Sequence, residues 1–290
     1  VTAAGGTQAP IVIEGYQTLR GDTPTGSNRP VITNGQGTTW TLGSAWETYN
    51  ISVIGTNGGA SAALTLGSNS KAINVKAVNS GTTAAKAALA LGADNYVFNV
   101  EAISYRGPAI SSGQAQVYLD AVYLHDSDKG FLYSGTSSPC VVINSIIADN
   151  VTAAVHISAS NTARSLISGT VLYGAENKLG IGLNVATGTT DLKSKNNIVY
   201  GFTTGVNHAD VQTVGFDDYN AYFNNTGGAR HNLDDTGATN PINTQHYLNQ
   251  FDVTLSADPF TNAAGGDFTA SNTHEFQVIA AVGEDTIFVC

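Results

Sequence analysis

The chain has 290 residues and is acidic, with a formal net charge of −10 at pH 7 and only 12% charged residues. Its 12 Lys and Arg residues are scattered, whereas binding to nucleic acid or to an anionic membrane needs clustered basic side chains. No apolar run approaches the roughly 18 residues that span a bilayer. We therefore expect neither nucleic acid as a partner nor insertion into a membrane.

Two short β-rich runs open the chain, at residues 10–16 and 29–32. Strands at the end of a stack leave an unpaired sheet edge that must be covered. Only about ten residues precede the first run. We therefore expect either a missing upstream segment or another chain to cover this end.

Between residues 64 and 206, apolar residues recur in two columns with a period of 21 to 27 residues. The first column consists of Val78, Ile103, Leu124, Ile147, Leu172 and Val199. The second consists of Leu64, Leu89, Ile110, Leu132, Val155, Ile181 and Val206. Repeats this short bury an apolar face only by stacking on copies of themselves.

Each repeat carries two β-rich runs, such as 141–147 and 154–157, joined by turns of variable length. Val155 and Ile157 alternate with His156, which is typical of a strand and predicts His156 on the surface. The pattern predicts an all-β fold, a single-stranded parallel β-solenoid of about seven to eight coils.

Small residues and asparagines occupy fixed places in the repeat. The residue before the second column is small, with Phe131 as the exception: Ala63, Ala88, Ala109, Ala154, Gly180 and Gly205. Small residues at a stacked corner predict a sharp bend. Asparagines follow the first run at Asn57, Asn79, Asn150 and Asn177, where they favour turns and can stack as a ladder.

The turns between the two columns form the best candidate for a functional site, because stacking brings their polar residues onto one flank. The candidate catalytic residues are Asp126, Asp149, Glu176, Arg106 and Lys129. The candidate binding residues are His125, Asp128, Asn150, Asn177 and Lys178. Adjacent coils lie about 4.8 Å apart, close to the roughly 5–5.5 Å between the carboxylates of retaining glycosidases, and two coils would suit the inverting geometry. The alternative is a solvated strip of turns without chemistry.

The repeat stops after residue 227, so we expect a parallel β-helix over residues 1–228 and a C-terminal excursion with a closing segment over 229–290, packed on the last coils. The excursion is either a binding loop or subunit contact, or a loop that covers the last coil. The histidines show no paired ligand spacing, and no metal site is expected from them.

Over roughly residues 11–228 the chain resembles the right-handed parallel β-helix superfamily, the pectate-lyase-like fold. Pro10–Tyr16 followed by Arg29–Ile32 looks like the start of such helices in bacterial and phage surface proteins. Asp258-Pro259-Phe260 with Gly266-Asp267-Phe268 looks like the segment that closes them. This fold hosts lyases, hydrolases, tailspikes and inert spacers, so the resemblance implies architecture and an extracellular or virion-surface location rather than an activity.

No catalytic motif of that superfamily matches residue by residue. The resemblance and the regular, sparsely charged repeat favour a non-catalytic structural or adhesive β-helix on a virion, such as a phage tailspike, fibre or decoration protein, with a polysaccharide as its candidate ligand. The first alternative is a secreted polysaccharide lyase or glycoside hydrolase that acts on an acidic polysaccharide. The second is a bacterial cell-surface spacer or adhesin.

A cofactor is expected only for the lyase alternative, in which Ca²⁺ would be held by Asp126, Asp149 and Glu176. Arg106, Lys129 or Lys178 would then supply the base. Proteins similar in look to this one often assemble side by side, so we expect a homo-oligomer, and by analogy a trimer. The alanines of the corner, taken as small outward residues, would allow such close lateral approach.

Overall fold

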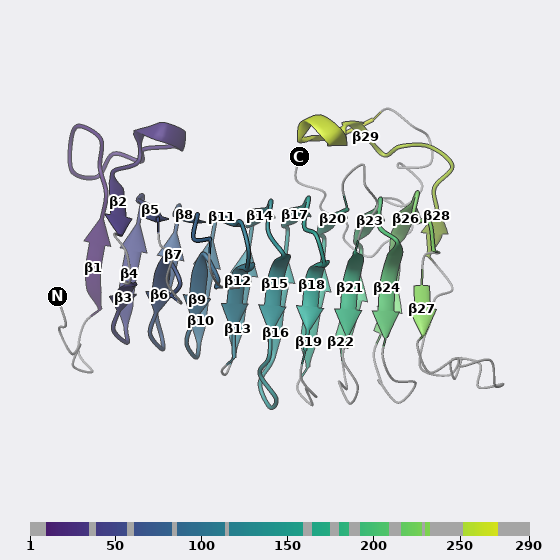
Figure 1. Cartoon of the computed structure of the whole chain (residues 1–290), viewed down its shortest axis with the longest axis horizontal. Helices are drawn as coiled ribbons and strands as arrows, with labels where there is room; N and C mark the ends of the chain where they lie inside the picture. Colours follow the sequence, from purple (N-terminus) through teal and green to yellow (C-terminus); the bar gives the residue numbers. More distant parts are fainter. Residues whose placement is uncertain are drawn as a thin grey trace.

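The chain folds as an all-β parallel β-solenoid (Figure 1). The computed structural model describes residues 10–34, 39–56, 61–82, 86–113, 116–158, 164–174, 180–185, 192–208, 216–227, 230–232 and 252–271. Parallel strands of successive coils lie side by side, as the stacked repeats predict. The predicted Asn57, Asn177 and most of the C-terminal excursion lie outside these residues.

Three parallel sheets run along the solenoid. Sheet A consists of β1 (Ile11–Glu14), β4 (Trp46–Tyr49), β7 (Lys71–Ile73), β10 (Asn95–Phe98), β13 (Val117–Asp120), β16 (Cys140–Ile143), β19 (Ser165–Ser168), β22 (Leu192–Lys195) and β25 (Phe216–Asp218). Sheet B consists of β2 (Val31–Asn34), β5 (Ser52–Gly55), β8 (Lys76–Asn79), β11 (Glu101–Ser104), β14 (Tyr123–His125), β17 (Ile146–Ala148), β20 (Val171–Tyr173), β23 (Ile198–Tyr200), β26 (Ala221–Phe223) and β28 (Val253–Thr254). Sheet C consists of β3 (Trp40–Leu42), β6 (Leu64–Leu66), β9 (Leu89–Leu91), β12 (Pro108–Ser112), β15 (Lys129–Tyr133), β18 (Ala153–Ile157), β21 (Ile181–Val185), β24 (Thr204–His208) and β27 (Arg230–Asn232). Among the described residues these sheets have nine, ten and nine strands, so the coil number differs slightly from the predicted seven to eight.

Each coil therefore has three strands, where the sequence pattern showed two runs. The run 141–147 covers the end of β16 and the start of β17. The two strands are separate because Asn144 turns the chain in a left-handed conformation (φ 50). Asparagine tolerates this conformation better than most residues. One apparent run thus contributes to two sheets, A and B.

The structure contains an asparagine ladder, but it lies at this turn between sheets A and B rather than after the first run, where the sequence predicted it. Asn74 donates from Nδ2 to Oδ1 of Asn50 at 2.7 Å, and Asn99 donates to Oδ1 of Asn74 at 3.3 Å. Two of the asparagines predicted to form the ladder, Asn79 and Asn150, are buried but bond to the backbone instead of to another asparagine. Asn79 donates to the carbonyl of Ala87, and Asn150 donates to that of Leu124.

The first apolar column is correct from Leu124 onward, where Leu124, Ile147, Leu172 and Val199 pair in register and are buried. Upstream the prediction is wrong by one residue. Ala102 pairs with Leu124 and Ala77 with Ala102, so Ile103 and Val78 lie on the outer face. A shift of one residue reverses which face a side chain occupies, and small inward alanines beside larger outward residues concealed the register.

The second column needs two corrections, a shift of one residue at Leu132 and a shift of two residues at Ile181. Phe131 rather than Leu132 pairs with Ile110, and Leu183 rather than Ile181 pairs with Val155. Phe131 and Leu183 are fully buried. The corner position before this column is then occupied by Gly130, a small residue, and Phe131 is no exception to the pattern. A Cβ on Gly130 would lie 2.2 Å from Ile147 Cγ2, so there is no room for a larger residue.

The small corner residues point into the solenoid. Ala63, Ala88, Ala109 and Ala154 are 0–1% exposed. The expectation that these alanines face outward and support lateral association is therefore wrong, because the corner bends the chain inward before each strand of sheet C.

The loop before β2 is anchored to the ladder. It contains a short 3₁₀ helix, η1 (Gly26–Asn28). Arg29 is 9% exposed and donates from Nη2 to Oδ1 of Asn74 at 2.6 Å. Asn74 in turn donates to the carbonyl of Pro24 at 3.0 Å. These bonds hold the loop onto the first coils.

Residues 252–271 cover part of the outer face of sheet B, which carries a second apolar cluster. After β28 the chain runs back along the solenoid (Figure 1) to the antiparallel pair β29 (Phe260–Asn262) and β30 (Asp267–Ala270), with η2 (Ala263–Gly265) between them. Phe260 and Phe268 pack against Tyr200 and Tyr173 respectively. The hydroxyl of Tyr200 donates to Oδ2 of Asp258 at 2.8 Å.

Candidate functional site

The predicted strip of turns lies where sheet B passes into sheet C. Asp126 follows β14 and Asp149 follows β17, and His125 pairs with Ala148 in the register of these strands. The two aspartates are therefore neighbours on adjacent coils, both in left-handed backbone conformation with φ 50 and 54. Their backbone positions are about 4.8 Å apart by the spacing of paired strands.

Other predicted residues are distributed unevenly. Arg106 is exposed in the preceding coil, and Lys129 begins β15. Asn150 is 2% exposed, which places it inside the turn rather than on the surface. Glu176, Asn177 and Lys178 lie outside the described residues.

His125 joins two coils through carboxylates. Its Nδ1 lies 2.8 Å from Oδ2 of Asp126, and its Nε2 lies 3.4 Å from Oε1 of Glu101. Lys76, one coil further back, donates to the same Oε1 at 2.6 Å. The result is a charged chain along the outer face of sheet B.

The electrostatics of this chain follow from its contacts. The hydrogen bond from His125 lowers the pKa of Glu101 to about 2, with Lys76 acting in the same direction against the effect of burial. Burial opposes the charged form of His125, but its bonds to Glu101 and Asp126 raise its pKa overall. Glu101 is thus held ionised, and His125 is biased toward the cation.

Asp149 has the opposite environment. Burial raises its pKa to about 6, and the negative charge of Asp126 acts in the same direction. A carboxyl whose pKa is raised toward neutrality, beside a second carboxylate, is the arrangement of a general acid and its partner. This pair is the part of the strip with a chemical rather than a purely structural character.

A second ionic contact closes the strip toward sheet C. Lys129 donates from Nζ to Oδ2 of Asp128 at 2.5 Å, and Thr152 on the next coil donates to the other carboxylate oxygen. Burial alone would raise the pKa of Asp128, but these two donors lower it. The carboxylate therefore ties two coils together.

Sequence reasoning missed Glu101 and Lys76, which occupy outward strand positions rather than turns. Their signal was the spacing of 25 residues between them, which equals one coil. It also missed a cleft on the outer face of sheet A, lined by Tyr96 and Tyr118.

Within the described ranges, no group of three or more His, Cys, Asp or Glu residues is placed to hold a metal ion. The lyase alternative would draw its third carboxylate from Glu176, which the structure does not describe. No helix in the described part of the chain is long and apolar enough to cross a membrane.

Asp149→Asn should raise the melting temperature at pH 7 and change it little at pH 4. The folded-state pKa of about 6 exceeds the ordinary value of 3.8, so native stability falls as the pH rises from about 4 through 6 and the carboxylate is buried charged at pH 7. Asparagine removes this cost and tolerates the left-handed backbone. Thermal denaturation followed by circular dichroism at both pH values measures the difference.

The matched control is Asp94→Asn, the same exchange at an exposed left-handed position with φ 53. It should alter the melting temperature little at either pH. An equal gain for Asp149→Asn at pH 4 and pH 7 would contradict the assigned cause.

Comparison of the chain with protein-family models, with curated proteins and with solved structures finds no significant match.

Proposed function

We propose that the chain is a non-catalytic structural and adhesive β-helix of the pectate-lyase-like kind, exposed on the outside of a virion as in a phage tailspike, fibre or decoration protein. The observation that carries this proposal is the pairing of charges along the candidate strip. Beside the strip, Glu101 of β11 binds both Lys76 and His125, which connects three coils, and within it Asp128 binds Lys129 and Thr152, which connects two.

Such pairing supports a structural role for most of the strip. A lyase needs a base that is free to reach the substrate. Of the two candidate bases that the structure describes, Lys129 is engaged by Asp128 at 2.5 Å, which leaves only the exposed Arg106. Ion pairs and hydrogen bonds instead join four successive coils, those that carry Lys76, Glu101, Asp128 and Thr152. Partly exposed ion pairs contribute little stability one by one, but they fix the register of neighbouring coils.

The second candidate is a glycoside hydrolase that acts on a polysaccharide, and a specific observation favours it. Asp149 has a pKa raised to about 6 beside Asp126 on the adjacent coil. A retaining mechanism needs an acid with a raised pKa and a second carboxylate roughly 5–5.5 Å away, and the spacing of adjacent coils is compatible with that distance. The competing proposals therefore differ in whether these two aspartates act on a glycan.

Incubation with a panel of neutral and acidic polysaccharides separates the two. We expect no turnover by the parent chain, measured at 235 nm for unsaturated uronates from a lyase and by reducing ends for hydrolysis. Asp126→Asn with Asp149→Asn is the matched variant, since asparagine preserves both left-handed turns.

Turnover that disappears in this double variant would replace our proposal by the hydrolase. Turnover that persists in it would also overturn the proposal and would place the chemistry elsewhere on the chain. Absence of product from every polysaccharide, with a folded parent chain, supports the non-catalytic role.

An extracellular location and assembly into a homo-oligomer, with a trimer by analogy, belong to the same proposal. Support for association comes from the first described coil. There Val12, Leu19 and Val31 are 53%, 73% and 55% exposed, and apolar side chains at the end of a stack of coils are candidate contacts for another chain. A bacterial cell-surface spacer or adhesin would share these features and differ in its biological setting.

A further inference from the structure

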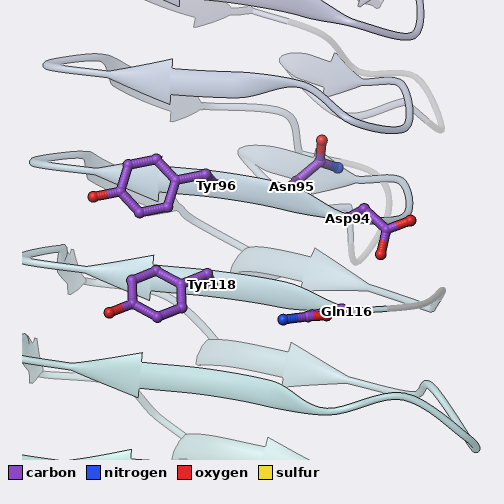
Figure 2. A pocket seen from close by; sticks show the side chains of 5 residues that line it. All are labelled: Asp94, Asn95, Tyr96, Gln116 and Tyr118. Carbon is purple, nitrogen blue, oxygen red and sulfur yellow. The ribbon is translucent and has the colours of Figure 1, made fainter.

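The outer face of sheet A carries a cleft that spans two coils. It is separate from the candidate strip of turns, because in each coil a strand of sheet B lies between the strand of sheet A and the turn. It has a volume of about 450 Å³ and is lined by Asp94, Asn95, Tyr96, Gln116 and Tyr118. This volume falls within the roughly 300–1,000 Å³ of small-molecule sites. Figure 2 shows the two tyrosine rings next to each other, with their faces toward the viewer.

Three aromatic rings form a platform in this region. Tyr96 and Tyr118 are paired in register on β10 and β13, with ring centroids 5.3 Å apart and planes inclined by 24°. Phe98 continues the platform along β10, 6.4 Å from Tyr96 and inclined by only 7°. Its side chain is 37% exposed. The platform thus consists of three rings with nearly parallel planes on the outside of the solenoid.

The tyrosine hydroxyls are not needed to hold the fold together. The hydroxyls of Tyr49, Tyr133 and Tyr200 each donate to another protein group. No protein group in the described part of the chain binds the hydroxyls of Tyr96 and Tyr118. Burial and the nearby carboxylate of Asp120 raise the pKa of both phenols, so both remain neutral hydroxyls that can donate to a ligand.

Polar groups surround the platform in the same order on both coils. Asp94 precedes Tyr96 by two residues, as Gln116 precedes Tyr118. Asn95 lies between them and is 2% exposed; its Oδ1 accepts the backbone N–H of Ser70 at 2.9 Å. Its Nδ2 has no partner among the described residues. Because neighbouring residues of a strand point to opposite faces, this amide lies on the inner side of β10 with the buried Val97 and is not part of the ligand-binding surface.

We infer that this cleft binds a neutral oligosaccharide, with pyranose rings stacked on Tyr96 and Tyr118 and hydroxyls bonded to Asp94 and Gln116. A pyranose combines an apolar C–H face with a rim of hydroxyls, and the cleft offers both aromatic faces and acceptors. Two equivalent coils suit a ligand with a repeating unit. The inference rests on the adhesive role proposed above and names its ligand.

The charge of the cleft determines the class of glycan. Its five lining residues include Asp94 and no Lys or Arg. The cation nearest in register, Lys71, is already bound to Glu47 at 2.7 Å. An anionic sugar would therefore face an uncompensated carboxylate, so electrostatics select against uronates and in favour of uncharged sugars.

Affinity measurements on the intact chain test this site. The probes are dextran, mannan and a series of β-1,4-linked glucose oligomers as neutral ligands, with polygalacturonate as the acidic one. We expect binding to at least one neutral probe. Tyr96→Ala with Tyr118→Ala should weaken it by about tenfold or more, because both stacking surfaces are lost.

Two further variants make the result specific. Tyr96→Phe with Tyr118→Phe keeps the rings and should retain most of the affinity. Tyr105→Ala removes a tyrosine that is 65% exposed in a turn outside the cleft, and it should change nothing. Circular dichroism establishes that each variant is folded before its affinity is compared.

The outcomes separate this inference from the proposed function. No binding to any neutral probe, or neutral binding that the double alanine variant leaves unchanged, would overturn the site. Binding to polygalacturonate alone would overturn the class of ligand. Turnover in the cleavage assay would overturn the non-catalytic role, while the tyrosine variants would still decide whether this cleft holds the glycan.

Discussion

Ile147→Asp is expected to prevent cooperative folding of the solenoid. Ile147 is fully buried on β17, stacked between Leu124 and Leu172 of the neighbouring coils. A carboxylate placed there loses its hydration and has apolar neighbours on both sides. The cost is comparable with the whole stability of about 5–15 kcal/mol of a typical domain. Loss of the sigmoidal thermal transition, followed by circular dichroism, is the measurement.

Thr65→Asp provides the control for this change. Thr65 lies on the outward side of β6, between Thr41 and Ala90 in the neighbouring strands. Its replacement should alter the free energy of unfolding by no more than about 0.5 kcal/mol, the range of ordinary surface substitutions. Equal tolerance at both positions would contradict the inward placement of the first column.

The period of the apolar residues was sufficient to predict the solenoid, because stacking identical coils requires the same pattern in each. Register was predictable where the inward residue is itself a large aliphatic residue, as Leu124 and Ile147 are. It was not predictable at Ala77 and Ala102, where the inward residue is an alanine beside a larger aliphatic residue on the outer face. The size of the side chains therefore cannot show which face of a strand points inward when the outer face is also partly buried.

The candidate site was partly predictable for a related reason. Asp126 and Asp149 were identified as neighbours because each follows a recognisable apolar strand by a fixed interval. The cleft on sheet A was not, because the turn at Asn144 and its equivalents was hidden inside apparently continuous runs. Without a third strand per coil, Tyr96 and Tyr118 had no face on which to meet.

The segment that covers sheet B is also stabilised by a few side chains, and Phe260 is the largest of those that are fully covered. It is 5% exposed and contacts Tyr200 and Phe268, with ring centroids 6.3 and 5.4 Å away. Sheet B itself is complete without this segment from β2 through β26. Removal of the contact should therefore release the segment locally and leave the solenoid folded.

Phe260→Ala is thus expected to cost about 3–5 kcal/mol of local stability, the usual range for a buried phenylalanine. Hydrogen exchange of the amides in β28 to β30 should accelerate strongly, while amides of β14 and β17 keep their protection. The exposed outer face around Tyr173 and Tyr200 should then bind a fluorescent apolar dye.

Phe98→Ala is the matched control, because Phe98 is 37% exposed on the outer face of sheet A and lies outside this segment. It should leave exchange in β28 to β30 unchanged. If Phe260→Ala instead lowered protection throughout β14 and β17, the covering segment would be part of the cooperative core. The solenoid would then depend on its C-terminal residues for folding, and the apolar outer face of sheet B would explain why, since no coil could leave it exposed to water.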